Sequence, residues 1–173
     1  MPNHVRNVLK FSKLTPTERD FILERFSTKE ENGERMFDFN LIIPEPRKES
    51  DCPADCKVNK DSHVQIDEKR PWFDWYEWHN KYWGTKWNAY DGYTKVGKSV
   101  ITFVFSTAWN IPYPIYRKLA KRYNFKFEIR YADEDLGSNC GKLIYDPETT
   151  GFADIVHIAT PDRNYAMRIW NNY

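Results

Sequence analysis

The 173-residue sequence lacks the features of a membrane or exported protein. No apolar run approaches the roughly 20 residues of a transmembrane helix, and the start, Met-Pro-Asn-His-Val-Arg-Asn-Val-Leu-Lys, has no apolar stretch as long as that of a signal peptide. Cysteine is scarce, and an odd number of three without a secretory signal favours reduced thiols. We therefore expect no membrane association and a cytoplasmic location.

An excess of charge of one sign is also absent. The chain has 26 Lys and Arg against 25 Asp and Glu, for a net charge of +1. This balance excludes a protein whose affinity comes mainly from phosphate contacts over its whole surface. A local basic region remains open, because residues 117–130 hold six cations and one acid, Glu128. We predict either a nucleic-acid contact or an ordinary solvated helix face from Arg117, Lys118, Lys121, Arg122, Lys126 and Arg130.

Metal and catalytic motifs are weak or missing. Cys52 and Cys56, followed by His63, lie within the spacing seen in zinc sites, with Cys140 or His79 as a fourth ligand, but a second tight pair is lacking. We therefore expect no metal and no cofactor. Four groups, Asp74, Glu77, His79 and Asp91, would have to meet in a cleft to form a hydrolase or transferase site, and they match no catalytic motif. We assign no catalytic residues and lean against an enzyme.

Aromatic residues, by contrast, are abundant and clustered. They make up 17% of the chain, and residues 71–93 hold five of its seven tryptophans: Trp72, Trp75, Trp78, Trp83 and Trp87. Each large aromatic carries roughly 150 to 250 Å² of surface that needs either a core or a partner. We expect this segment to carry the specificity of the protein.

Hydrophobic periodicity predicts alternating strands and helices. The N-terminal half gives a strand at 3–11, a helix from a Thr15–Glu18 capping box to about Ser27, and a strand at 37–43 that Pro44 ends. The remaining elements are a helix at 71–82, a strand at 99–105, a helix that begins between Pro112 and Pro114, a strand at 125–131, a hairpin of 141–145 with 153–158, and a final helix capped at 160–162.

This order predicts one α+β domain over residues 1–173. It is a ferredoxin-like split β-α-β sandwich with a Trp-rich helical insertion at about 44–98 and a C-terminal hairpin plus helix. Both helices of such a fold pack on one face of an antiparallel sheet. We expect the other face to be covered by the aromatic insertion or open to a ligand.

Two blocks, Trp83-Gly84-Thr85-Lys86-Trp87-Asn88-Ala89 and Phe105-Ser106-Thr107-Ala108-Trp109-Asn110-Ile111-Pro112-Tyr113-Pro114, resemble the signatures of the YubB-type ferredoxin-like proteins of phages and plasmids. Met1-Pro2-Asn3 and Ile43-Pro44-Glu45-Pro46 are similar to further parts of that family. The resemblance covers most of residues 1–146 and implies the same fold and a mobile-element origin, but no reaction. The family commonly has an aspartate at Asn88 and an aromatic residue at His4.

The candidate partner-binding residues lie in and beside these blocks: Trp83, Lys86, Trp87, Asn88 and Trp109. Tryptophan is a frequent interface anchor, and a lysine beside aromatic faces can hold an anion. The alternative is that Trp83 and Trp87 only wedge the insertion onto the sheet. Our leading hypothesis is an accessory protein that binds a host macromolecule, foremost a protein, with counter-defence implied by the resemblance alone. The alternatives are single-stranded nucleic-acid binding on the open sheet face, and the hydrolase or transferase.

Overall fold

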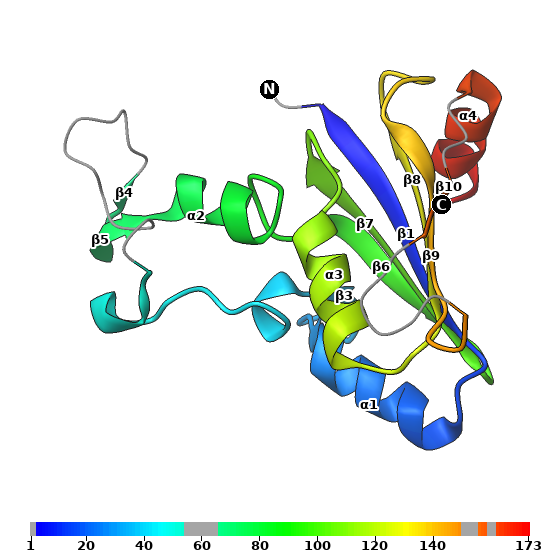
Figure 1. Ribbon diagram of the computed structural model, residues 1–173, viewed down its shortest axis with the longest axis horizontal. Helices are drawn as coiled ribbons and strands as arrows, with labels where there is room; N and C mark the ends of the chain where they lie inside the picture. Colours follow the sequence, from blue (N-terminus) through cyan, green and yellow to red (C-terminus); the bar gives the residue numbers. More distant parts are fainter. Residues whose placement is uncertain (1–2, 54–65, 150–155, 159–161) are drawn as a thin grey trace.

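A six-stranded antiparallel sheet forms the centre of the computed structural model, which describes residues 3–53, 66–149, 156–158 and 162–173 (Figure 1). The strands lie in the order β10-β9-β8-β1-β7-β6. Their bounds are β1 His4–Ser12, β6 Tyr90–Val96, β7 Val100–Ala108, β8 Phe127–Asp133, β9 Cys140–Tyr145 and β10 Val156–Ile158.

The first four strands of this sheet have ferredoxin-like topology. Along the chain, β1, α1 (Pro16–Phe26), β6, β7, α3 (Tyr113–Arg122) and β8 make two β-α-β units. Strand β1 lies between β7 and β8, so the order β8-β1-β7-β6 is that of a split β-α-β sandwich. The predicted α+β, ferredoxin-like fold is confirmed, and β9 with β10 extends the sheet past β8.

Helices α1 and α3 cover one face of the sheet. The capping box predicted for α1 is present, because Thr15 Oγ1 accepts from the Glu18 amide at 3.3 Å and Glu18 Oε2 accepts from the Thr15 amide at 2.8 Å. In α3, the Tyr116 hydroxyl donates to Asn7 Oδ1 at 2.8 Å, which satisfies a polar side chain buried on β1. The hydrophobic core lies between this helix layer and the sheet: Val5, Leu9, Phe11, Ile22, Phe26, Phe103, Phe105, Ile115, Leu119 and Ile129.

Helix α4 (Arg163–Asn172) covers part of the opposite face. Asp162 caps it as predicted, its carboxylate accepting from the Tyr165 amide at 2.5 Å. Ala166 and Ile169 pack with Val8 and with other outward-facing strand residues. The expectation that the aromatic insertion covers this face is therefore wrong. The insertion extends the core beside α1 and α3, where Phe73, Trp78 and Trp83 are buried.

The prediction of a strand at 37–43 is wrong. Arg35–Phe37 forms the short strand β3, paired with β2 (Ser27–Lys29), and Phe39–Leu41 forms a 3-10 turn, η1. The apolar alternation arises because this segment packs on the sheet: the Phe37 ring of β3 stacks on Phe105 at 5.0 Å between centroids, and the Phe39 ring of η1 lies edge-on to Phe105 at 5.9 Å. The second strand of the fold is instead β6, so the insertion occupies residues 27–89 rather than about 44–98.

The helix predicted at 71–82 begins later. Residues Arg70–Asp74 form strand β5, paired with β4 (Ile66–Asp67), and α2 runs over Trp75–Tyr82. The Asp74 carboxylate accepts from the Glu77 amide at 3.1 Å and so fixes the start of the helix. Helix α2 projects sideways from the sheet (Figure 1), and its His79 contacts Glu45 of the preceding loop. Trp78 is only 4% exposed.

The C-terminal elements agree with the sequence. The hairpin of β9 and β10 is present, although residues 150–155 and 159–161 lie outside the described part of the chain. Within the described ranges, no helix has the length and apolarity needed to cross a bilayer. A further 3-10 turn, η2, occupies Glu49–Asp51.

Candidate functional site

Two of the seven tryptophans are exposed. Trp87 is 36% and Trp109 39% exposed, whereas Trp78 and Trp83 are buried and the remaining three are half-buried. Trp87 lies in the loop before β6, and Trp109 directly follows β7. The fold therefore brings together at the surface two large rings that are far apart in the sequence.

A lysine lies between these rings. The Lys86 Nζ is 4.7 Å from the centroid of Trp87, 5.4 Å from that of Trp109 and 5.9 Å from that of Tyr76. At these distances the ammonium is attracted to the ring faces. We call Tyr76, Lys86, Trp87 and Trp109 the Lys86 cluster. Among the described residues, no carboxylate forms an ion pair with Lys86.

The backbone at Trp109 is strained, with a φ of +66°. A bulky side chain rarely adopts this left-handed conformation, which persists only where the surroundings hold it and is common at functional sites. Here the Trp109 amide donates to the Asn3 carbonyl at 2.9 Å, and Asn139 Nδ2 donates to the Trp109 carbonyl at 2.9 Å. Both bonds hold the backbone from which the ring projects.

The two signature blocks contact each other directly. Thr85 Oγ1 donates to the Ala108 carbonyl at 2.8 Å and accepts from the Ala108 amide at 3.1 Å. Gly84 has a φ of +79°, and a Cβ added there would lie 2.6 Å from Cδ of Pro114. The blocks therefore form one structural unit that carries Lys86 and Trp87 on one side and Trp109 on the other.

A family model described as a ferredoxin-like domain in Api92-like protein matches residues 82–169. The chain belongs to this family. Both signature blocks fall within the match, which begins next to Trp83 and extends into α4. No curated protein and no solved structure matches the chain.

In this ferredoxin-like chain a buried histidine supports the Lys86 cluster from below. The His79 ring stacks on Trp83, with centroids 4.0 Å apart, and its Nδ1 lies 2.8 Å from the Lys86 carbonyl. Its Nε2 lies 2.6 Å from Oε1 of Glu45, whose other oxygen accepts from Arg70 at 2.6 Å. Because both groups that face the ring are acceptors, the imidazole satisfies both only when it is doubly protonated.

The Glu45 carboxylate is held in its charged form. Burial acts to raise the pKa of Glu45, but the hydrogen bonds and charges of His79 and Arg70 outweigh it and keep the pKa below its ordinary 4.5. No local sequence pattern signals this pair, because 34 residues separate the two partners. Only the folded loop brings them together.

The other two predicted partner-binding residues, Trp83 and Asn88, bond to the insertion, and Trp83 is buried while Asn88 is half-buried. Trp83 is 1% exposed, and its Nε1 donates to the Ile43 carbonyl at 2.9 Å. Asn88 accepts from the Phe39 amide at 2.9 Å and donates to Asp38 Oδ1 at 2.7 Å. These two side chains therefore hold the insertion together, while Lys86, Trp87 and Trp109 face outward. Tyr76, which was not among the predicted partner-binding residues, completes the Lys86 cluster.

Polar aromatic groups line the edge of the cluster. Tyr90 packs edge-on against Trp87, with ring centroids 5.9 Å apart, and its hydroxyl is 2.6 Å from Nδ1 of His4. Burial, followed by the charges of Glu134 and Asp91, raises the pKa of Tyr90 to about 12. The phenol therefore stays neutral. With His4 it forms a hydrogen-bonding edge beside Trp87, close to the carboxylates of Glu134 and Asp91.

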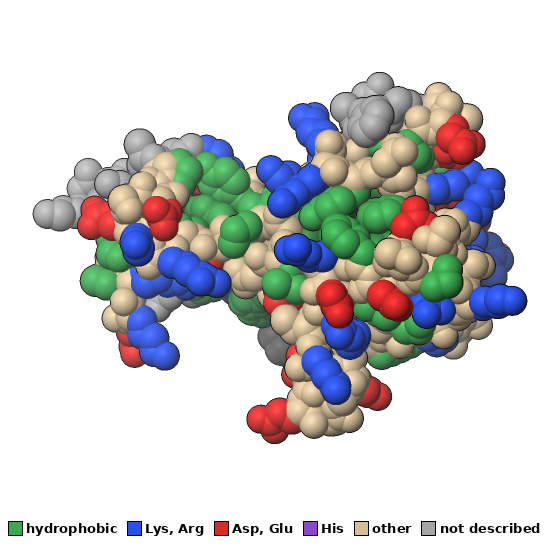
Figure 2. Space-filling model, turned by 90° about the horizontal axis from the view of Figure 1, so that it is seen from below, with side chains coloured by type: hydrophobic (Ala, Val, Ile, Leu, Met, Phe, Trp, Pro, Cys, Tyr) green, Lys and Arg blue, Asp and Glu red, His purple; other side chains and the backbone are tan. Residues whose placement is uncertain are grey.

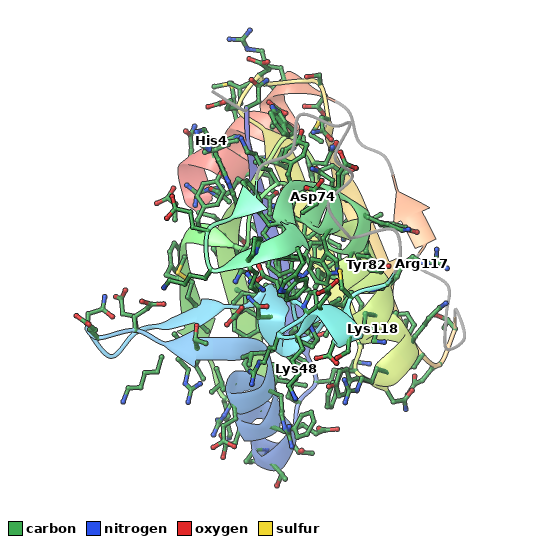
Figure 3. The ribbon with its side chains drawn as sticks, turned by 90° about the vertical axis from the view of Figure 1, so that its left-hand side faces the viewer. His4, Lys48, Asp74, Tyr82, Arg117 and Lys118 are labelled. Atoms are coloured by element: carbon green, nitrogen blue, oxygen red, sulfur yellow. The ribbon has the colours of Figure 1, made fainter. Side chains whose placement is uncertain are left out.

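The structure separates the six predicted basic residues. Those of α3 are exposed, and Figure 3 shows Arg117 and Lys118 on the side of the molecule away from His4. Lys126 is ion-paired with Asp146, and Arg130 with Glu128 at 2.6 Å. Arg130 also lies on the sheet face that α4 partly covers, because it alternates with the core residues Ile129 and Tyr131. Of the six predicted residues, the exposed surface of α3 therefore holds four: Arg117, Lys118, Lys121 and Arg122.

The candidate catalytic groups do not converge. Asp74 caps α2, His79 binds Glu45, and Asp91 pairs with Arg6 at 3.4 Å.

Cys52 is disulfide-bonded, so the expectation of a reduced thiol is wrong for this residue, and Cys56 and His63 lie outside the described residues. In the part of the chain that the structure describes, no three His, Cys, Asp or Glu side chains gather as metal ligands would.

Proposed function

We propose that this chain binds a protein of a host cell through the Lys86 cluster. One observation carries the proposal: the two exposed tryptophans come from separate loops and meet around a lysine that no carboxylate of the described residues pairs with. Tryptophans that only stabilised the fold would be buried, as Trp83 is. Exposed Trp and Tyr in a fixed arrangement are the residues that dominate the energy of protein interfaces.

The geometry indicates the chemistry of the partner surface. Trp87 and Trp109 supply apolar area that gains free energy when a partner removes it from water. Lys86 adds a positive charge at the centre, so we expect an acidic side chain of the partner among apolar ones. The strained backbone at Trp109 and the bonds from Asn3 and Asn139 fix one ring before binding, which lowers the entropy cost of association.

The experiment is capture of partners from extracts of the host cell with immobilised wild-type protein and with Trp87→Ala and Lys86→Met variants. We expect one protein to be retained by the wild type and to bind each variant at least tenfold more weakly in a purified assay. Acrylamide quenching of tryptophan fluorescence would fall on complex formation, because a partner would cover the two exposed indoles.

Met167→Ala on α4 is the matched control, because Met167 is 38% exposed and lies outside the cluster. Thermal unfolding of every variant checks that the fold is intact. A partner that binds wild type, Trp87→Ala and Met167→Ala equally would exclude the Lys86 cluster as the interface.

The origin and location of the protein belong to the same proposal. The two blocks at 83–89 and 105–114 support a phage or plasmid source, and from it follow a host partner, a role against host defence and a cytoplasmic location. Survival of phage in host strains with and without the captured partner tests the role in counter-defence. Equal phage growth in both strains would remove that part of the proposal.

A further inference from the structure

A second aromatic surface lies between α1 and α3, away from the Lys86 cluster. Phe21 is 37% exposed, and its ring is 5.8 Å from that of Tyr123 and 6.0 Å from that of Phe125. Tyr123 and Phe125 are nearly parallel, at 15°. We call these three residues the Phe21 surface. Figure 2 shows hydrophobic side chains gathered in this region, with Lys and Arg at its edge.

Cations frame the Phe21 surface. The Arg25 guanidinium is 5.9 Å from the Phe21 centroid, and that of Arg122 is 5.5 Å from the Tyr123 centroid. The outer side of α3 adds Arg117, Lys118 and Lys121, all exposed. Helix α3 contains no acidic residue, and within the described residues none of its cations forms an ion pair. Four neighbouring positive charges therefore stand without a counter-charge on their own helix.

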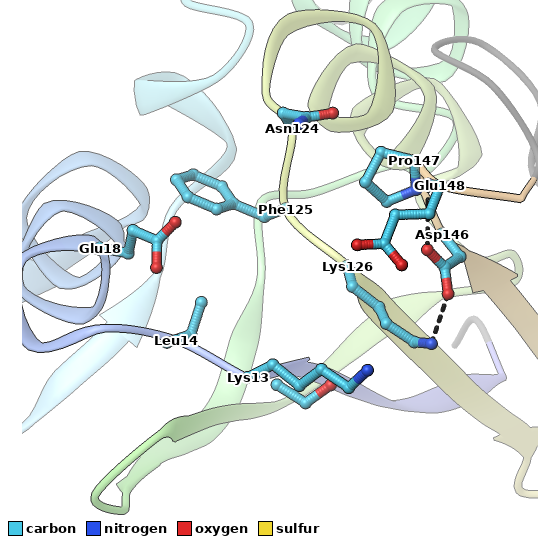
Figure 4. A pocket seen from close by; sticks show the side chains of 10 residues that line it. Lys13, Leu14, Glu18, Asn124, Phe125, Lys126, Asp146, Pro147 and Glu148 are labelled. Carbon is cyan, nitrogen blue, oxygen red and sulfur yellow. Dashed lines mark hydrogen bonds and ion pairs between the residues drawn. The ribbon is translucent and has the colours of Figure 1, made fainter.

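Most carboxylates around this surface already have partners. On α1, Glu18 binds Thr15 and Asp20 pairs with Arg19 at 3.4 Å, while Glu24 is exposed. Beside Phe125, a shallow pocket contains Lys13 and Lys126 together with Asp146 and Glu148, and Figure 4 shows the ion pair of Lys126 with Asp146. Glu18 also lines the pocket, so two lysines face three carboxylates there, and the pocket marks the end of the basic surface.

We propose that α3 and the Phe21 surface bind single-stranded nucleic acid. The exposed Phe21 ring, with the half-buried rings of Tyr123 and Phe125 beside it, offers a stacking partner to any base. A row of Lys and Arg follows the phosphates, and this is the combination that non-specific single-strand binders use. The four cations of α3 have no carboxylate on their own helix, which suits a partner with one negative charge per nucleotide better than a protein surface of mixed charge. The proposal is independent of the Lys86 cluster. It also differs from the sheet-face hypothesis, because α4 occupies part of that face.

The test is fluorescence anisotropy of a labelled oligo-dT of about 15 nucleotides, titrated with the full-length protein at about 50 and 200 mM salt. If four phosphates are neutralised, log K falls against log salt with a slope of roughly −3, since each phosphate contact on a single strand contributes about −0.7. Phe21→Ala should weaken binding by about tenfold and leave this slope unchanged, because it removes stacking and no charge.

A double variant, Lys118→Gln with Lys121→Gln, should halve the slope to roughly −1.5. Its matched control is Lys10→Gln with Lys95→Gln, which removes the same charge. Lys10 and Lys95 are both opposite Thr102 in the sheet register, on the face away from α1 and α3. We expect the control pair to leave the slope near −3.

Three results would overturn the proposal. The first is no binding at about 50 mM salt. The second is an equal slope for the Lys118/Lys121 variant and the Lys10/Lys95 control. The third is competition by polyglutamate as effective as that by oligo-dT with Phe21→Ala unaffected, which would assign the surface to an acidic protein. Circular dichroism of each variant confirms that the fold is retained.

Discussion

Gly84 is the residue on which the meeting of the two signature blocks depends. Its φ of +79° is one that side-chain-bearing residues rarely adopt, and the space beside its Cα is filled by Pro114 and the Ile111 carbonyl. Thr85 follows at once and bonds both the amide and the carbonyl of Ala108. A glycine therefore permits the turn and the close approach that place Lys86 against Trp109.

Replacement of Gly84 should show both effects. We expect Gly84→Ala to lower the free energy of unfolding by about 3 kcal/mol, because left-handed strain and the overlap with Pro114 add. Gly33→Ala is the matched control: Gly33 has a φ of +86° but nothing within 4 Å of an added Cβ. It should cost about 1 kcal/mol, from strain alone. Urea denaturation measures both, and equal losses would show that the contact with Pro114 contributes nothing.

The sequence identified the block that carries the candidate site but not the direction of its side chains. Lys86, Trp87 and Trp109 reach the surface, whereas Trp83 and Asn88, from the same block, are turned toward the insertion by hydrogen bonds to Ile43, Phe39 and Asp38. No period of the sequence separates these two groups, because residues 83–89 form an irregular turn. Their directions depend on hydrogen bonds to a loop some 40 to 50 residues earlier.

At the scale of elements, one partly buried ion-pair network ties α2 to the loop before it. Glu45 belongs to that loop, His79 to α2, and Arg70 to β5. The same histidine faces the Lys86 carbonyl, so the network also holds the turn that carries Lys86. A change of charge at Glu45 therefore affects three segments together.

Acid should weaken this network. The pKa of Glu45 in the folded protein is lower than its ordinary value of 4.5, so the carboxylate stabilises the fold above that value, and the stabilisation is lost as pH falls through the lower folded pKa. Glu45→Gln should cost about 2 kcal/mol at neutral pH and reduce the acid dependence of unfolding measured in urea. Glu24→Gln, on the exposed face of α1, is the control that should match wild type. An unchanged acid dependence in Glu45→Gln would contradict the prediction.

Elements with local signals were predicted well, and those fixed by distant contacts were not. The capping box at Thr15 and the cap at Asp162 depend on neighbours in sequence, so α1 and α4 were placed correctly. The alternation at 37–43 has the period of a strand, yet it arises because the Phe37 ring packs this segment against Phe103 and Phe105 of β7. The start of α2 moved to Trp75 because pairing with β4 takes residues 70–74. Alternating apolar residues alone do not distinguish a strand from an irregular segment that packs on a sheet.

At the scale of the whole molecule, the family match leaves out the middle of the sheet. The matched region, residues 82–169, contains β6, β7, α3, β8, β9 and β10. Strand β1 lies between β7 and β8 and pairs with both over most of its length. Without β1, the inner edges of β7 and β8 lose their hydrogen-bond partners and the core loses Val5, Leu9 and Phe11.

We therefore expect residues 82–173 alone to lack a cooperative fold. The unpaired edges of two central strands and the exposed apolar face beneath α3 should leave a fragment that aggregates or unfolds without a sharp transition. Amide dispersion in NMR spectra and urea denaturation are the measurements. Addition of a synthetic peptide of residues 3–26, which carries β1 and α1, should restore dispersed signals, whereas a scrambled peptide of the same composition should not. A sharp unfolding transition of the fragment alone would show that the region matched by the family folds independently of its central strand.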